Sequence, residues 1–177
     1  MKDESSTKSE WIQSVLDRYS GPLTRFAMHI TGDLERARDI VQDTFIRLCA
    51  EEQAQVEEKI AEWLFTVCRN RALNIQRKEK RMEPLTPFQM ESCVSSDHSP
   101  AVQVERQENA DRLLQLVGTL PKNQQEVLRL KFQNDLSYKE ISRVTSLSIS
   151  NVGFLIHTAI KTLRQQLKKQ GDWVPET

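Results

Sequence analysis

The apolar residues of this chain recur three and four positions apart, and strict alternation of apolar and polar residues is nearly absent. Four apolar stripes precede residue 82, and each is expected to be the buried face of a helix. The tripeptides SGP at 20–22 and TGD at 31–33 are expected to end the first two helices, and Asp33 to cap the third. The stripes are Trp11, Ile12, Val15, Leu16 and Tyr19; Leu23, Phe26, Ala27 and Ile30; Leu34, Ala37, Val41, Phe45 and Leu48; and Ile60, Leu64, Val67, Cys68 and Ile75.

The pattern changes after Arg81. Residues 82–103 contain three prolines and several serines and show no helical period, which is typical of a flexible linker. From residue 104 the helical pattern resumes. The sequence therefore predicts an all-α protein with two small helical domains, 1–81 and 104–177, joined by a flexible linker at 82–103. A chain of 177 residues is long enough for two domains that each bury a core.

The second domain is expected to end in a short helix, a tight turn and a longer helix. Ser137 and Glu140 form a capping box that starts the short helix, and Ser148 can cap the longer one. Pro121 suits the start of an earlier helix, which is followed by a turn at QND, 133–135. The expected inner positions are Leu113, Leu114, Val117 and Leu120; Val127, Leu128, Leu130 and Phe132; Ile141 and Val144; and Ile149, Val152, Ile156, Ala159 and Leu163.

Two short helices joined by a tight turn, the second with a polar outer face, are typical of a helix-turn-helix that binds DNA. The last helix has no Lys or Arg between Ser148 and Ile160. Its outer residues can still read bases, because Asn pairs with adenine, Ser and Thr exchange hydrogen bonds, and Phe contacts a thymine methyl. Plain bundle corners share this pattern, so a purely structural role stays open. The outer face consists of Ser150, Asn151, Gly153, Phe154, His157, Thr158 and Lys161.

The charges are balanced, with 25 Lys plus Arg and 25 Asp plus Glu, although a protein that coats DNA non-specifically would be basic. Balance predicts that basic and acidic surfaces are separated. Cations flank the last helix and can contact phosphates: Lys139, Arg143, Lys161, Arg164, Lys168 and Lys169. The most basic stretch is RNRALNIQRKEKR at 69–81, which either binds nucleic acid or is a solvated helix end that favours cations. Asp39 and Asp43 are expected to face outward beside Gln42 and Arg47, which suits a protein partner.

Several classes of function find no support in the sequence. The three cysteines and three histidines are scattered, so no metal site or disulfide framework is expected. The N-terminus lacks an apolar signal core and no apolar run is long enough to span a membrane, so we expect a reduced cytoplasmic protein that does not insert into membranes. We find no catalytic constellation and expect no cofactor and no small-molecule substrate.

These residues together resemble the extracytoplasmic-function (ECF) group of bacterial sigma factors over nearly the whole chain. ERARDIVQDTFIRL resembles the helix by which the family's region two grips the clamp coiled coil of RNA polymerase. EWLFTVCRNRALNIQRKEKR resembles the helix that melts and reads the minus-ten element. LQLVGTLPKNQQEVLRLKF and LSYKEISRVTSLSISNVGFLIHTAIKTLR resemble region four, which reads the minus-thirty-five element.

The resemblance implies roles for particular residues. Asp39, Gln42, Asp43 and Arg47 would bind polymerase, while Phe45 on the same helix is counted as core. The DNA-binding residues would be Arg69, Asn70, Asn74, Arg77 and Lys78 on one helix, with Arg143, Ser150, Asn151, Gly153, Phe154, His157, Thr158 and Lys161 in the helix-turn-helix. The sequence departs from the family at Gly153, Leu155, Thr158 and Ile160, where basic residues are common, and in the acidic stretch EEQAQVEEK before Trp63.

The implied function is that of a sigma factor, which binds core RNA polymerase, positions it on a promoter and helps to melt the start site. The polymerase supplies the chemistry, so the chain would not be an enzyme and would need no cofactor. Core RNA polymerase and promoter DNA are the expected partners, and an anti-sigma factor is a further partner that the resemblance allows. The alternatives are a helix-turn-helix transcriptional regulator that is not a polymerase subunit, and a helical adaptor that does not touch DNA.

Overall fold

The computed structural model describes residues 4–82 and 113–169, and every secondary-structure element within these ranges is a helix. The predicted all-α fold is therefore confirmed. The described residues fall into two compact units: residues 4–82 together with Lys139–Ser146, and residues 113–138 together with 147–169. The predicted linker at 82–103 lies outside the described residues except for Met82, so the domain boundaries at 81 and 104 stay predictions.

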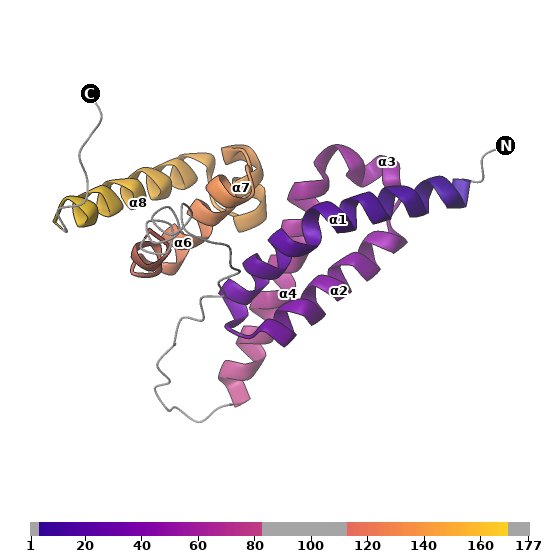
Figure 1. Cartoon of the computed structure of the whole chain (residues 1–177), viewed down its shortest axis with the longest axis horizontal. Helices are drawn as coiled ribbons and strands as arrows, with labels where there is room; N and C mark the ends of the chain where they lie inside the picture. The colour runs from indigo at the N-terminus through magenta and orange to yellow at the C-terminus, as the bar shows by residue number, and fades with distance from the viewer. Residues whose placement is uncertain (1–3, 83–112, 170–177) are drawn as a thin grey trace, which may run out of the picture. The chain divides into compact units, whose positions relative to one another are not determined.

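The first unit is built on three long helices, α1 (Glu4–Thr31), α2 (Leu34–Ala50) and α4 (Ile60–Met82), which pack against one another (Figure 1). Short turns of helix, α3 (Gln53–Val56) and η1 (Glu57–Lys59), connect α2 to α4, so the acidic stretch before Trp63 is helical. The rings of Phe26 on α1 and Phe65 on α4 meet edge to face, with centroids 5.3 Å apart. The core residues that are fully enclosed include Leu23, Ala27, Ala37, Ile40, Leu48, Leu64, Cys68 and Ala72.

Helix α1 corrects the predicted break at residues 20–22, because it runs without interruption through Pro22. Proline has no N–H, so the carbonyl of Arg18 loses its usual helical donor. The Thr24 hydroxyl donates to the carbonyl of Ser20, two residues after Arg18, at 2.7 Å. Apolar residues on both sides of the proline, Val15 before it and Leu23 after it, are buried. Burial of one continuous stripe thus outweighs the local preference for a break.

The predicted turn between α1 and α2 is confirmed. Gly32 adopts a φ of +71° and its N–H donates to the Met28 carbonyl at 2.7 Å, which ends α1. The Asp33 carboxylate accepts from the backbone N–H of Arg36 at 2.8 Å and caps α2 as expected. At the other end of α2, the Lys8 ammonium donates to the carbonyls of Cys49 and Glu51 at 3.0 and 2.8 Å. Both ends of α2 therefore have charged partners of the favourable sign.

The second unit contains a helical stretch at 113–118, then α6 (Lys122–Leu128), a π-helical turn η2 (Arg129–Gln133) and α8 (Ile149–Lys169). Helix α7 (Tyr138–Thr145) lies between η2 and α8 along the chain. Pro121 precedes α6 as its cap, and the buried Gln125 amide donates to the carbonyls of Gly118 and Leu120 at 3.0 and 2.7 Å. This amide holds the turn before α6 against the helix.

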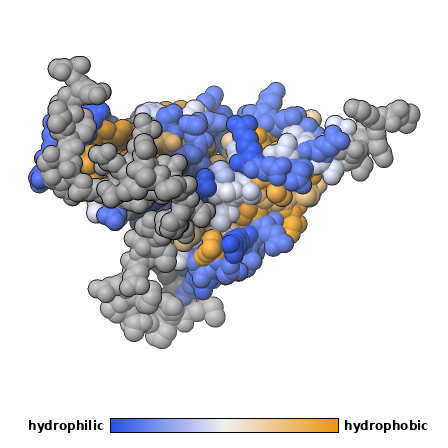
Figure 2. Space-filling model, in the orientation of Figure 1, coloured by the Kyte–Doolittle hydropathy of each residue, from blue (hydrophilic) through white to orange (hydrophobic). Residues whose placement is uncertain are grey.

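Most of the residues predicted to face the core are buried, but several near the ends of helices are exposed. Val127, Leu128, Leu130, Ile141, Val144, Val152, Ile156, Ala159 and Leu163 are buried as expected. Six expected core residues are instead exposed: Leu16, Leu34, Leu113, Leu114, Phe132 and Ile149. Phe132 lies in η2, where the π-helical turn changes the number of residues per turn and so shifts the phase of the stripe. Figure 2 shows the result, a mainly hydrophilic visible surface with hydrophobic stretches between the polar faces.

Replacement of Pro22 by Ala is expected to stabilise the first unit, by up to about 3 kcal/mol in the free energy of unfolding, because alanine restores the helical N–H. Denaturation of the full chain would be followed by tryptophan fluorescence in a Trp173→Phe background, so that Trp11 and Trp63 report on the first unit. Pro121→Ala, a proline substitution in the second unit just before a helix, is the control and should leave the transition reported by Trp11 and Trp63 unchanged. An unchanged or lower stability of Pro22→Ala would show that the packing of α1 depends on the proline ring.

Candidate nucleic-acid and partner-binding surfaces

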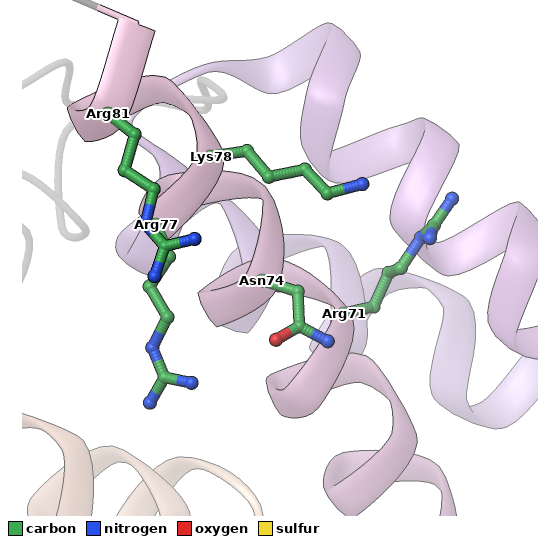
Figure 3. A pocket seen from close by; sticks show the side chains of 5 residues that line it. All are labelled: Arg71, Asn74, Arg77, Lys78 and Arg81. Carbon is green, nitrogen blue, oxygen red and sulfur yellow. The ribbon is translucent and has the colours of Figure 1, made fainter.

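The C-terminal half of α4 carries a basic face. Arg71, Asn74, Arg77, Lys78 and Arg81 line a shallow groove of about 320 Å³, and their side chains rise from successive turns of the helix (Figure 3). Asn70, Asn74, Arg77 and Lys78 were expected on this face and are exposed. Spacings of three, four and seven residues place them together. The groove offers cationic and amide donors with an open mouth, which suits a phosphate backbone rather than a small ligand.

Two groove residues were missing from the predicted set, and one predicted residue lies to the side. Arg71 and Arg81 belong to the same face, as a helical wheel through Asn74 and Arg77 indicates. Arg69, which was expected to bind DNA, is half-buried beside the face instead of at its centre. The side chain of Lys80 lies outside the described residues.

The cations of α4 differ in how they are held. The Arg71 guanidinium binds Oδ2 of Asp43 on α2 through Nη2 at 2.9 Å and Nε at 3.1 Å. A second ion pair joins Arg36 of α2 to Glu79 of α4. Within the described ranges neither Arg77 nor Lys78 has an ion-pair partner. Arg71 is thus anchored to the protein, while Arg77 and Lys78 present their charges to solvent.

Helix α2 presents a polar face with an apolar centre. Asp39, Gln42 and Arg47 are exposed as predicted, and Asp43 is partly exposed while it binds Arg71. Phe45 is 7% exposed, so its prediction as a core residue is confirmed. Ile46 was not predicted here, yet it is 61% exposed and lies three, four and seven residues from Asp43, Gln42 and Asp39. A large exposed apolar residue ringed by polar ones is typical of a protein-binding surface.

The outer face of α8, which was predicted to read bases, is exposed. Ser150, Asn151, Phe154, His157 and Lys161 are exposed, and Gly153 and Thr158 are partly exposed. Phe154 is 65% exposed, which makes it the most exposed large apolar residue among those described.

The turn before α8 is also as expected. Ser148 caps the helix by accepting from the N–H of Asn151 at 3.2 Å, and Ser146 takes a φ of +60°. Arg143 is exposed on α7, one turn before the end of that helix. Sequential helices 138–145 and 149–169 joined by three residues are those of a helix-turn-helix.

The described residues hold no group of three or more His, Cys, Asp or Glu side chains placed to bind a metal ion. Burial raises the pKa of the Cys68 thiol to about 12, so this side chain is a packing residue and not a nucleophile. No helix in the described part of the chain is both long and apolar enough to cross a membrane.

Two family models match this chain, one in each half. Residues 15–82 match the family model of sigma-70 region 2, and residues 110–163 match that of sigma-70 region 4. The chain is 31% identical over 158 residues to the ECF RNA polymerase sigma factor SigM of Bacillus subtilis, covering 89% of this chain and 93% of SigM. It is 25% identical over 165 residues to SigW of the same organism, covering 87% of each protein.

Solved structures agree on the fold. The sigma factor RpoE from Bartonella quintana, solved in complex with the anti-sigma factor NepR, matches with a TM-score of 0.65 at 19% identity, over 90% of this chain and 96% of that one. CnrH, solved with the cytosolic domain of CnrY, matches with a TM-score of 0.57 at 18% identity, over 91% and 90%. With both sigma regions in order and a relative above 30% identity along nearly its whole length, the chain belongs to the ECF RNA polymerase sigma factors.

Proposed function

We propose that this chain acts as a sigma factor by binding core RNA polymerase through α2 and promoter DNA through α4 and α8. The observation that carries the proposal is the presence, in one chain, of an exposed basic face on region 2 and an exposed uncharged reading face on region 4. A helix-turn-helix regulator would have no need of region 2, and an adaptor that avoids DNA would have no need of either face. The polymerase supplies the chemistry, so no enzymatic activity is assigned to the chain.

Further partners and location follow from the same proposal. RpoE of Bartonella quintana was solved with an anti-sigma factor, which supports an anti-sigma protein as an additional partner of this chain. Since core polymerase and promoter DNA are its proposed partners, we place its action in the cytoplasm.

The proposed polymerase-binding face of α2 consists of Asp39, Gln42, Ile46 and Arg47, with Asp43 at its edge. Ile46 supplies apolar area that would be desolvated on binding, and the surrounding charges supply orientation. Asp43 is the less suitable residue for a charge reversal, because an arginine there would also face Arg71 and lose an internal ion pair. Asp39 is exposed and makes a cleaner test.

Asp39→Arg is expected to weaken the complex with core polymerase by at least about tenfold, since like charges across an interface cost on the order of several kcal/mol. Affinity would be measured by titrating labelled full-length chain with core enzyme. Asp17→Arg, the same charge change at an exposed position of α1, is the control and should bind like the unmodified chain. Equal affinities for both variants would remove α2 from the interface.

The proposed minus-ten surface is the basic groove of α4. Arg77 and Lys78 are consecutive exposed residues that both line the groove and have no ion-pair partner in the described residues, so each can replace a counterion on a phosphate. Asn70 and Asn74 add amide groups that can hydrogen-bond to exposed bases or to the backbone.

Arg77→Ala and Lys78→Ala are each expected to lower the slope of log affinity against log salt by about one for promoter complexes of the reconstituted polymerase. The complexes would be measured by filter binding across a salt series. Arg38→Ala is the control, because that exposed cation of α2 already pairs with Glu35 at 2.7 Å. If the α4 variants keep the full slope, the groove does not hold phosphates.

The proposed minus-thirty-five surface is the outer face of α8, where specificity would come from neutral contacts. Phe154 can lie against a thymine methyl, and His157, one turn later, can exchange hydrogen bonds with a base edge. Phosphate contacts would come from Lys161 and Arg164 on α8 itself and from Arg143 on α7, whose guanidinium also pairs with Glu62 at 2.8 Å. Recognition of the bases and contact with the phosphates are thus assigned to different residues.

Phe154→Ala or His157→Ala is expected to cost roughly 1–3 kcal/mol on duplexes selected from a random pool by the unmodified holoenzyme. Binding to scrambled duplexes should barely change, because the phosphate contacts remain. Phe132→Ala is the matched control, since that phenylalanine on η2 is similarly exposed, at 61% against 65%. Equal losses on selected and scrambled DNA would show that this face does not read sequence.

A further inference from the structure

The ion pair between Arg71 and Asp43 joins the two proposed binding faces of region 2. Arg71 belongs to α4 and lines the basic groove, while Asp43 belongs to α2 and lies at the edge of the proposed polymerase-binding face. The Arg71 guanidinium donates to Oδ2 of Asp43 through Nη2 at 2.9 Å and Nε at 3.1 Å. Its side chain points away from that of Arg77 (Figure 3), so the pair holds one groove cation back on the α2 side.

This pair can exchange partners. The two side chains are 43% and 44% exposed, and ion pairs with this exposure are weak because water and salt screen them. Both bonds from Arg71 end on Oδ2, and Oδ1 accepts no hydrogen bond from any other residue that the structure describes. A carboxylate has acceptor sites on both oxygens, so a second cation can bind Oδ1 before Arg71 leaves.

The surroundings of Asp43 fit a basic partner. Asp39 lies four residues earlier on the same face of α2, is exposed and has no ion-pair partner among the described residues. A cation held by both carboxylates would compete with Arg71 for the charge of Asp43. Once that charge is taken, the guanidinium is free to turn toward the groove beside Arg77 and Lys78.

We propose that Asp43 and Arg71 form a switch that links binding of polymerase to binding of DNA. In the free chain Asp43 neutralises Arg71, which withholds one cation from the groove. When a basic segment of core polymerase binds Asp39 and Asp43, Arg71 is released and makes one more phosphate contact. Linkage is reciprocal, so DNA that takes Arg71 leaves Asp43 open to the polymerase. The inference rests on the proposed function, because it needs α2 to meet polymerase and α4 to meet DNA.

The first test follows the salt dependence of binding to selected duplexes by the full chain, both alone and in saturated holoenzyme. Asp43→Asn leaves Arg71 permanently free, and is expected to raise the slope of log affinity against log salt by about one for the chain alone but not for the holoenzyme. Arg71→Gln removes the released cation, and is expected to lower the slope by about one for the holoenzyme only.

Glu79→Gln is the matched control, because it breaks the other ion pair between the two helices, whose cation Arg36 does not line the groove. It should leave the slope of the free chain as it is. The inference is overturned if Asp43→Asn keeps the slope of the unmodified chain, if Glu79→Gln raises the slope equally, or if Arg71→Gln lowers it equally in both states.

A second test needs no DNA. Arg71→Gln frees Asp43 for the partner, so titration with core polymerase is expected to show an affinity gain of roughly two- to fivefold, the effect of losing a weak competing ion pair. Arg25→Gln, which removes an exposed cation of α1, is the control and should bind core polymerase like the unmodified chain. An affinity of Arg71→Gln no higher than that of Arg25→Gln would show that Arg71 and the polymerase do not compete for Asp43.

Arg77→Ala and Asp39→Arg separate this inference from a failure of the proposed function. If both have their expected effects, on DNA and on polymerase, while Asp43→Asn and Arg71→Gln have none, only the switch is removed. If Arg77→Ala keeps the full salt slope or Asp39→Arg keeps the full affinity for polymerase, the corresponding face is not a binding face, and the proposed function fails together with the inference.

Discussion

The buried seam between α1, α2 and α4 determines where the functional faces of region 2 point. Leu23, Ile40 and Leu64, one from each helix, are completely enclosed. A helix that buries one stripe must expose the opposite one, so this seam sets the rotation of α2 and of α4 about their own axes. The polar face around Ile46 and the basic face around Arg77 are consequences of that packing. Neither would be directed outward if the apolar stripes were shifted by one or two residues.

The ion pairs between α2 and α4 add a second constraint to the seam. Arg71 binds Asp43 and Arg36 pairs with Glu79, so each helix gives one cation and one anion to the other. Partly exposed pairs of this kind contribute little to stability, typically under about 1 kcal/mol. Their effect here is on the distribution of charge, because they neutralise Arg71 at the edge of the groove and leave Arg77, Lys78 and Arg81 without an ion-pair partner among the described residues. The proposed polymerase face and the proposed DNA face thus share Asp43 and Arg71 as a common border.

The sequence predicted those features that depend on local chemistry. Gly32 and Asp33 mark a real boundary because a positive φ and a side-chain cap are properties of the residues themselves, and Ser148 caps α8 for the same reason. Pro22 was misleading because its local cost is smaller than the gain from a continuous buried stripe. The positions at stripe ends, such as Ile149, could not be placed from periodicity, which does not say how far the partner helix extends. Phe132 is exposed because the π-helical turn changes the number of residues per turn, and the period of the apolar residues does not reveal such a turn.

Sites were predictable to the extent that they follow from a helical wheel. The wheel placed Asp39, Gln42, Arg77 and Phe154 on outer faces, and the exposed fractions agree. It also contained two residues that the predicted sites did not include: Ile46, which lies outside the predicted apolar stripe of its helix, and Arg71, which lies one turn before Asn74.

The distribution of charge explains how a chain of zero net charge can bind DNA at chosen places. Attraction to phosphates grows with the number of counterions released, and it is independent of sequence. In this chain the cations are gathered on α4 and at the margins of the helix-turn-helix, while the stretch before Trp63 is acidic and α2 carries equal numbers of acidic and basic residues. Acidic surfaces repel DNA that approaches in other orientations, which limits non-specific binding. Because α8 makes few phosphate contacts of its own, its contribution to DNA affinity comes from Phe154, His157 and their neighbours. That contribution is lost on DNA whose base sequence does not match them.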